Sequence, residues 1–316
     1  MEKNYTKKLI KLKLEGIGSE GDTTGYYNCE QINIFGGIPG ETVLAEIDIQ
    51  KKTKRKKSRI YGIVKKILIS SPNRLKPPCQ FYGFCTGCNW QHIKYEHQLK
   101  LKEQIIYKEI NSRITSKINI KKIIHSEKQF NYRNHARFSI RRNGQIGFTN
   151  KVTKKFAAIN HCLIMNNKIN KYINNLENLV GETSQLSIRA SENTNSFLIQ
   201  PKFKNSDIKI ETGQKYYAEQ ISGYKFQISS SSFFQVNSNQ IENMKNTILS
   251  LIKDNRKGLL VDAYSGVGTF GILLSKYFEK VIGIEQSSSA VIDAKNNIEN
   301  ISNYKILTGN SEDIIK

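Results

Sequence analysis

Four cysteines are the residues of this chain whose type and spacing most directly predict chemistry. Three of them form a C-x5-C-x2-C motif and the fourth lies far downstream: Cys79, Cys85, Cys88 and Cys162. Prolines precede the motif and glycines lie within it, and such residues form the tight turns that a thiolate cage needs. Four sulfur ligands suit an iron–sulfur cluster or a structural zinc ion. Because a zinc ribbon usually has two close C-x-x-C pairs, the remote fourth ligand favours a cluster; ordinary buried cysteines are the alternative.

The fifth cysteine, Cys29, lies in a strand-like stretch, and we expect it to pack as a small apolar side chain. Five cysteines in 316 residues do not predict a disulfide scaffold, so the composition indicates a reducing compartment. The chain opens on no secretory pattern and contains no apolar run of membrane-spanning length. The sequence therefore predicts a soluble cytoplasmic protein.

The net charge of +22 is the strongest statement that the composition makes. Such an excess of one sign predicts a polyanionic partner, and nucleic acid is favoured over a membrane because no basic amphipathic helix is visible. Seven of the nine residues in 51–59 are Lys or Arg, which favours a loop that follows an RNA backbone. A lysine-rich overall composition and a merely solvated hairpin tip are the alternatives.

The pattern of elements predicts three domains. Short alternating strands at 9–14, 42–49 and 59–69, separated by glycine turns, predict a small RNA-binding β-barrel over residues 1–68. Residues 69–230 contain the cysteine motif, a helical pattern at 95–113 and probable strands at 137–141, 145–148, 185–189 and 197–200. These predict a central α+β domain. Its segment 131–137 interleaves cations with a tyrosine, which fits either contact with RNA or an exposed strand start.

Residues 231–316 alternate helix and strand. We expect a helix at 239–253, a buried strand at 258–264, a strand at 280–285, a helix at 288–300 and a strand at 304–308. Three parallel strands with two crossovers make half of a nucleotide-binding sheet. The fold class is therefore α/β, with a Rossmann-like domain incomplete at its C-terminus.

A glycine motif follows the first of these strands. Gly266, Gly268 and Gly271 fit G-x-G-x-x-G. Glu285 follows about twenty residues later, at the position where a carboxylate accepts hydrogen bonds from the ribose hydroxyls. Both NAD and S-adenosylmethionine carry that ribose. Asp262 decides between them, because a carboxylate beside the turn suits the cationic methionine portion of S-adenosylmethionine and would repel a pyrophosphate. The motif predicts S-adenosylmethionine as cofactor.

Four stretches together resemble the RNA 5-methyluridine methyltransferases, and most closely their iron–sulfur, TRAM-domain branch, which modifies uracil C5 in 23S ribosomal RNA. The stretches are 15–41, 79–98, SFFQVN at 232–237 and DAYSGVGTF at 262–270. The resemblance implies that Cys79, Cys85, Cys88 and the remote Cys162 hold a 4Fe–4S cluster with a structural role. It also implies an S-adenosylmethionine pocket lined by Gln235, Asp262, Tyr264, Gly266, Gly268, Thr269, Glu285 and Asn310.

In that family a cysteine thiolate adds to C6 of a flipped uridine, C5 takes the methyl group, and a carboxylate removes the C5 proton. By the resemblance, both catalytic residues lie further towards the C-terminus than Lys316, so we expect none within this chain. The sequence thus indicates the front part of a methyltransferase, inactive and poorly soluble alone and monomeric at full length. A non-catalytic RNA-binding iron–sulfur protein and a transfer RNA methyltransferase are the alternatives.

Overall fold

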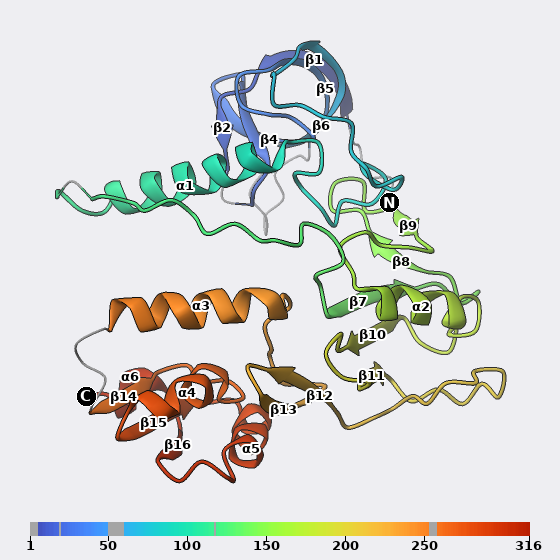
Figure 1. The fold of residues 1–316 in the computed structure, drawn as a ribbon. Helices are drawn as coiled ribbons and strands as arrows, with labels where there is room; N and C mark the ends of the chain where they lie inside the picture. Colours follow the sequence, from blue (N-terminus) through green and yellow to red (C-terminus); the bar gives the residue numbers. More distant parts are fainter. Residues whose placement is uncertain (1–5, 19, 50–59, 117, 253–257) are drawn as a thin grey trace. The chain divides into compact units, whose positions relative to one another are not determined.

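The computed structural model describes residues 6–18, 20–49, 60–116, 118–252 and 258–316. The chain divides into two compact units. The first comprises Met1–His125 with Phe148–Ala157, and the second comprises Ser126–Gly147 with Ala158–Lys316. Figure 1 shows the elements of both units along the chain. The cationic segment 51–59 lies outside the described residues.

The first unit contains a six-stranded sheet in the order β1-β5-β6-β4-β3-β2. Alternate residues of its strands point inward, and the aliphatic ones form a buried cluster that includes Leu12, Ile34 and Ile47. The predicted strand at 42–49 is confirmed, and those near 9–14 and 59–69 are confirmed with slightly shifted ends. The prediction did not locate β2, β3 or β4. The strands are β1 Thr6–Lys13, β2 Gly16–Ile17, β3 Thr23–Tyr27, β4 Glu30–Phe35, β5 Thr42–Ile49 and β6 Ile60–Ile69.

Cys29 is not a buried strand residue, so that expectation was wrong. It is exposed, in the two-residue turn between β3 and β4, whose ends pair through Tyr27 and Glu30. Asn28 and Cys29 have φ angles of 49° and 62°. A two-residue hairpin whose central residues both have positive φ matches the right-handed twist of its strands. The turn geometry therefore excludes Cys29 from the sheet and from the core.

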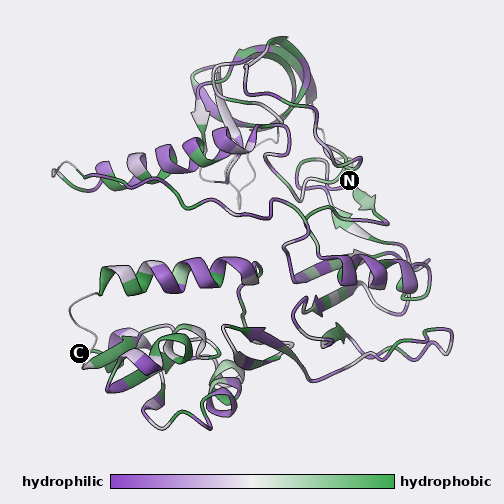
Figure 2. Cartoon of the chain, viewed as in Figure 1, coloured by the Kyte–Doolittle hydropathy of each residue, from purple (hydrophilic) through white to green (hydrophobic). Residues whose placement is uncertain are grey.

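Helix α1, Tyr95–Asn111, follows the cysteine segment and confirms the predicted helix. The observed helix ends two residues before the predicted end at residue 113. Only Leu101 is buried on it, in a small cluster with Ile38 and Ile93. Figure 2 shows that most of α1 is hydrophilic. Leu101 therefore packs α1 into this cluster, and Gln98 adds side-chain hydrogen bonds to the carbonyls of Trp90 and Ile93.

A five-stranded sheet in the order β11-β10-β7-β8-β9 forms the centre of the chain. Residues 148–157, the outer ends of β8 and β9 with their connection, belong to the first unit. The four predicted strands are confirmed, whereas β9, α2 and the β12–β13 hairpin were not predicted. The elements are β7 His135–Ile140, β8 Ile146–Thr149, β9 Phe156–Ala158, α2 Asn167–Leu176, β10 Gln185–Ala190, β11 Phe197–Gln200, β12 Tyr216–Ile221 and β13 Tyr224–Ser229.

The last part of the second unit is a parallel sheet in the order β14-β15-β16. Parallel pairing of β15 with both neighbours confirms the predicted α/β arrangement with two crossovers. The predicted helix at 239–253 is α3, and residue 253 lies outside the described residues. The elements are α3 Ser238–Leu251, β14 Leu259–Asp262, α4 Thr269–Leu274, a 3₁₀ turn at Ser275–Tyr277, β15 Lys280–Glu285, α5 Ser288–Asn297, β16 Tyr304–Thr308 and α6 Ser311–Ile314.

Strand β14 corrects one expectation, because it is not buried. Leu259 and Val261 are 55% and 43% exposed, whereas Val281 and Ile284 of β15 are buried. Residues two apart share one face of a strand, and β14 pairs only with β15 in the described sheet. Its apolar composition alone therefore did not fix its burial.

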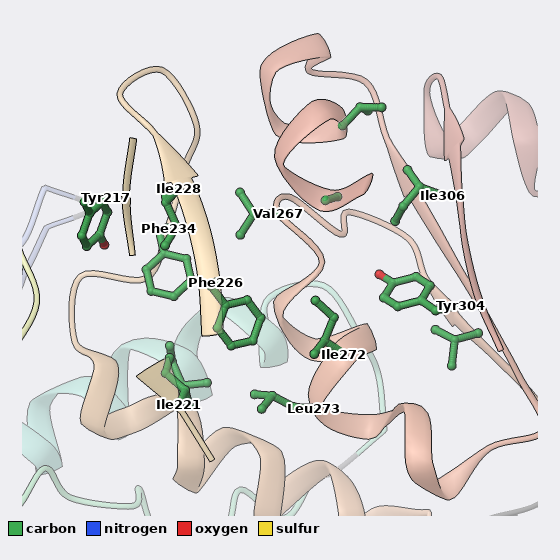
Figure 3. Packing of buried hydrophobic residues seen from close by; sticks show 14 of the residues in the cluster. Tyr217, Ile221, Phe226, Ile228, Phe234, Val267, Ile272, Leu273, Tyr304 and Ile306 are labelled. Atoms are coloured by element: carbon green, nitrogen blue, oxygen red, sulfur yellow. The ribbon is translucent and has the colours of Figure 1, made fainter. Parts of the chain in front are cut away.

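One hydrophobic core joins the β12–β13 hairpin to the parallel sheet (Figure 3). The rings of Phe226 and Phe234 lie 6.1 Å apart in it, and Val267 and Ile272 belong to the same cluster. The segment between β13 and α3 is thereby packed against the turn that follows β14. No described helix combines the length and the apolar character that a membrane span requires.

Candidate functional site

The turn between β14 and α4 has the backbone shape that its glycines predict. Gly266 and Gly268 have φ angles of 54° and 85°, which side chains rarely permit. The amide of Ser265 donates to the carbonyl of Ile284, and the amide of Gly268 donates to that of Ser265. A Cβ built on Gly266 would meet no atom within 4 Å. The turn is therefore fixed from behind and open at Gly266, where a ligand could approach the backbone.

The third glycine of the motif has a packing role. A Cβ on Gly271 would lie 2.3 Å from the hydroxyl oxygen of Tyr304, and one on Gly283 would lie 2.6 Å from the same atom. No real side chain tolerates such approaches. Two glycines, one on α4 and one on β15, thus make the space into which the Tyr304 ring fits. This places α4 close to the sheet and its first turn at the strand ends.

Two carboxylates end β14 and β15, and each accepts a hydrogen bond from a glycine of the motif, Glu285 from the turn and Asp262 from α4. Oδ2 of Asp262 accepts a hydrogen bond from the amide of Gly271 at 3.0 Å. Oε2 of Glu285 accepts from the amide of Gly266 at 2.8 Å, and its Oε1 accepts from that of Ser287 at 2.8 Å. Each carboxylate oxygen has two lone pairs, so both acids retain capacity for further donors.

Asp262 differs from an ordinary surface acid. Burial raises the pKa of its carboxyl group, the hydrogen bond from Gly271 lowers it, and the nearby charge of Glu285 raises it again, so that the pKa stays above its usual value. A half-buried acid held next to a second acid gains most from a cationic ligand. The pair therefore provides an environment that favours positive charge at the end of the sheet.

The end of β16 completes this edge. Tyr264 is 73% exposed, and its hydroxyl donates to Oε1 of Glu312 at 2.5 Å, which raises the pKa of the phenol. The side chain of Asn310 donates to Oδ2 of Asp313 at 3.2 Å. The amide of Gly309 donates to the carbonyl of Glu285 at 3.0 Å. The connection after β16 thus adjoins the glycine turn, and Glu312, which the sequence reasoning missed, belongs to it.

The predicted cofactor residues fall into two groups. Seven of them lie at the carboxyl ends of the three parallel strands or in the turn between β14 and α4: Asp262, Tyr264, Gly266, Gly268, Thr269, Glu285 and Asn310. The eighth, Gln235, is half-buried in the segment before α3 and follows Phe234, which packs in the core beside Val267. The acid in the first turn of α6 was the sequence signal that could have found Glu312.

The cysteine motif lies in the first unit on hydrogen-bonded turns. The amide of Tyr82 donates to the carbonyl of Cys79 at 3.1 Å, and the amide of Cys85 donates to that of Phe81 at 2.6 Å. The motif is also bound to the six-stranded sheet, since the indole of Trp90 donates to the carbonyl of Gly21 at 2.6 Å. The ligand loop therefore has a defined backbone.

The buried ring of His92 also links the cysteine motif to the segment between β4 and β5. Its Nε2 lies 2.8 Å from the carbonyl oxygen of Gly37, and its Nδ1 lies 2.5 Å from the hydroxyl oxygen of Tyr82. Burial lowers the pKa of His92 to about 4, so the ring is neutral near pH 7. A neutral ring can donate from one nitrogen and accept at the other, and this satisfies both contacts.

The four candidate ligands are divided between the two units, since Cys79, Cys85 and Cys88 belong to the first. Cys162 lies in the second unit, where its amide donates to Oδ1 of Asn170 at 2.8 Å. Within the part of the chain that the structure describes, no three or more His, Cys, Asp or Glu side chains are grouped to hold a metal ion. The four sulfur donors suit an iron–sulfur cluster chemically, and we derive no reaction step through it.

Comparisons with known proteins find similarity to RNA methyltransferases. The family model described as tRNA (Uracil-5-)-methyltransferase matches residues 193–316. An uncharacterized RNA methyltransferase from Aquifex aeolicus is 28% identical over 92% of this chain and 75% of its own length. One from Clostridium acetobutylicum is 28% identical over 100% of this chain and 81% of its own length.

A solved structure shares the fold. It is the Pyrococcus abyssi tRNA (uracil-54, C5)-methyltransferase in complex with S-adenosyl-L-homocysteine, 23% identical, with a TM-score of 0.65 over 94% of this chain and 79% of that one. The fold, the glycine turn and the named relatives define an S-adenosylmethionine-dependent RNA methyltransferase. Within that class, residues 193–316 match the model of the tRNA (Uracil-5-)-methyltransferase family, and the chain is similar over 92–100% of its length to the two RNA methyltransferases named above.

Proposed function

We propose that this protein serves the methylation of uracil C5 in 23S ribosomal RNA, with S-adenosylmethionine bound at the ends of β14, β15 and β16. The observation that carries the proposal is the pair of acids, Asp262 and Glu285, each hydrogen-bonded to a glycine of the motif. Glu285 would accept hydrogen bonds from the ribose hydroxyls of S-adenosylmethionine, and Asp262 would face its cationic methionine portion. Gln235, Tyr264 and Asn310 would line the same pocket, with Thr269 beside the turn.

Within this proposal three domains share the work. Residues 1–68, including the cationic segment, would bind RNA, residues 69–230 would carry the cysteine motif, and residues 231–316 would bind the cofactor. The net charge of +22 supports an RNA partner. We assign the protein to the cytoplasm, as a monomer at full length, and assign no cysteine within residues 1–316 as the nucleophile that adds to uracil C6.

Ribosomal RNA is favoured because the cysteine motif and the N-terminal segment together resemble the ribosomal branch. Transfer RNA is the second candidate, since both the matching family model and the solved relative carry names for transfer RNA enzymes. Competition binding distinguishes them. We expect fragments of 23S ribosomal RNA to displace a labelled RNA from the chain at lower concentration than transfer RNA does, measured at one fixed salt concentration. The reverse order would favour the transfer RNA candidate.

We further propose that Cys79, Cys85, Cys88 and Cys162 hold a 4Fe–4S cluster that stabilises the fold. Their residue type and the hydrogen-bonded turns of the motif support this. Anaerobic purification is expected to give a brown protein with about four iron and four sulfide per chain. The variant Cys162→Ser should lose the colour, whereas Cys29→Ser, at the exposed hairpin turn, should keep it. A colourless protein with stoichiometric zinc would contradict the cluster.

A further inference from the structure

The segment 230–237, here called the strap, connects β13 to α3 and carries Gln235. It lies between the end of β13 at Ser229 and the start of α3 at Ser238, and no helix or strand forms within it. Phe234 anchors it in the core, but the backbone around Gln235 needs other partners to hold one conformation. Those partners are Asn134 and Arg189, which lie 101 and 43 positions before the strap residues that they contact.

Asn134, immediately before β7, donates hydrogen bonds to two successive carbonyl groups of the strap, those of Gln235 and Val236. Its amide nitrogen donates to the carbonyl of Val236 at 3.0 Å, and its side-chain nitrogen donates to that of Gln235 at 3.1 Å. The same side-chain nitrogen donates to the hydroxyl of Ser238 at 2.9 Å. Asn134 is only 3% exposed, so water does not compete for these bonds.

The central sheet fixes Asn134 in turn. The carbonyl of Asn134 accepts from the amide of Ala190 at 3.0 Å, which joins it to the end of β10. Arg133 and Asn237 form an isolated antiparallel bridge beside it. The strap is therefore added to the central sheet at the beginning of β7, and it does not depend on the parallel sheet alone.

Arg189 of β10 supplies a second attachment. It is 3% exposed, its Nη2 donates to the carbonyl of Ser232 at 2.6 Å, and its guanidinium carbon lies 5.8 Å from the centre of the Tyr217 ring. A buried cation costs free energy, and a hydrogen bond to a neutral carbonyl offsets only part of that cost. Such a residue contributes more to the choice of one strap conformation than to overall stability.

We propose that Asn134 and Arg189 are positioning residues for cofactor binding, which hold the strap so that Gln235 is preset in the pocket. The central domain would then shape the cofactor site besides carrying the cysteine motif. This inference rests on the proposed function, because it takes Gln235 as a cofactor contact. Neither positioning residue touches the cofactor in this scheme.

A double-mutant cycle with the 316-residue chain tests the inference. The dissociation constant of S-adenosylmethionine is measured by calorimetry for the wild type, Asn134→Ala, Gln235→Ala and the double variant. We expect each single change to weaken binding by about 5- to 30-fold. If Asn134 acts through Gln235, the double variant should be no weaker than the worse single variant, since the two residues are coupled. Multiplied effects would overturn the positioning role.

The matched control is Asn303→Ala. Asn303 also donates from its side chain to two carbonyls, those of Ser275 and Phe278, but it lies away from the strap. It should lower stability without a Gln235-dependent effect on affinity. If Gln235→Ala leaves binding unchanged, the cofactor assignment of Gln235 fails and the positioning role with it. If Gln235→Ala weakens binding and Asn134→Ala adds fully to it, only the positioning role fails.

Hydrogen exchange tests the attachment without any cofactor. Asn134→Ala and Arg189→Met should each speed amide exchange over residues 230–237, whereas Asn303→Ala should not, because only the first two remove bonds to the strap. Unchanged amide exchange over residues 230–237 in both Asn134→Ala and Arg189→Met would overturn the inference, even if the chain bound no S-adenosylmethionine.

Discussion

Replacement of Glu285 by alanine is expected to weaken S-adenosylmethionine binding by about 2 to 3 kcal/mol, because the ribose would lose two hydrogen bonds to a carboxylate. The substitution also removes the acceptor for the amides of Gly266 and Ser287, so the open side of the turn loses its fixed shape. Calorimetric titration of the chain measures the change directly.

The control for this prediction is Glu299→Ala, an exposed acid of the same unit outside the strand ends. It removes the same charge and should leave the affinity unchanged within a few tenths of a kcal/mol. Equal affinity of wild type and Glu285→Ala would contradict the role of Glu285. Equal losses in both variants would show a general charge effect.

The substitution Glu41→Ala is expected to destabilise the first unit by about 3 to 5 kcal/mol, since it leaves the Arg74 guanidinium unpaired in a partly buried position. The Glu41 side chain is fully buried, and its two oxygens accept from Nε and Nη2 of Arg74, both at 2.6 Å. They also accept from the amides of Ile38 and Ser71. Urea unfolding followed by circular dichroism measures the loss.

Glu46→Ala is the matched control for this pair. Its carboxylate pairs with Lys7 and Lys65 on the same sheet, but at the surface, with side chains that water reaches. Such an exposed pair contributes about 0 to 1 kcal/mol. A loss at Glu41 no larger than that at Glu46 would contradict the structural role of the buried pair.

Stability of the first unit should depend on pH through the same carboxylate. Burial alone raises the pKa of Glu41, but the hydrogen bond from Arg74, with those from Ser71 and Ile38, outweighs it and holds the pKa below the usual 4.5. The stabilisation is therefore fully present above pH 4.5 and is lost as the pH falls through the lower folded-state pKa. Glu41→Gln should abolish this contribution to the acid dependence.

The parallel sheet was predictable because its signals are local. The apolar strand at 280–285, the glycine turn before α4 and the acid at Glu285 lie within one short stretch, and their spacing alone indicates where each falls. The placement of Asp262 and Glu285 at one edge followed from this, since parallel strands bring their carboxyl ends together. The other candidate residues at that edge, Tyr264, Thr269 and Asn310, were named through the family resemblance.

What the sequence did not reveal depends on contacts between distant residues or on backbone angles. The exposure of Leu259 follows from the position of β14 in the sheet, and Cys29 follows from the positive φ of a hairpin turn. Asn134 supports a segment one hundred residues away, and no periodicity in either stretch indicates that contact. Sequence reasoning located the glycine turn but not the side chains that hold its surroundings.

The most direct test of the cofactor assignment is to titrate the chain with S-adenosylmethionine and, separately, with NAD. Asp262 and Glu285 at the glycine turn predict that the sulfonium cofactor binds at one site per chain and that the dinucleotide, with its pyrophosphate, does not. Binding of NAD in place of S-adenosylmethionine, or of neither, would contradict the account.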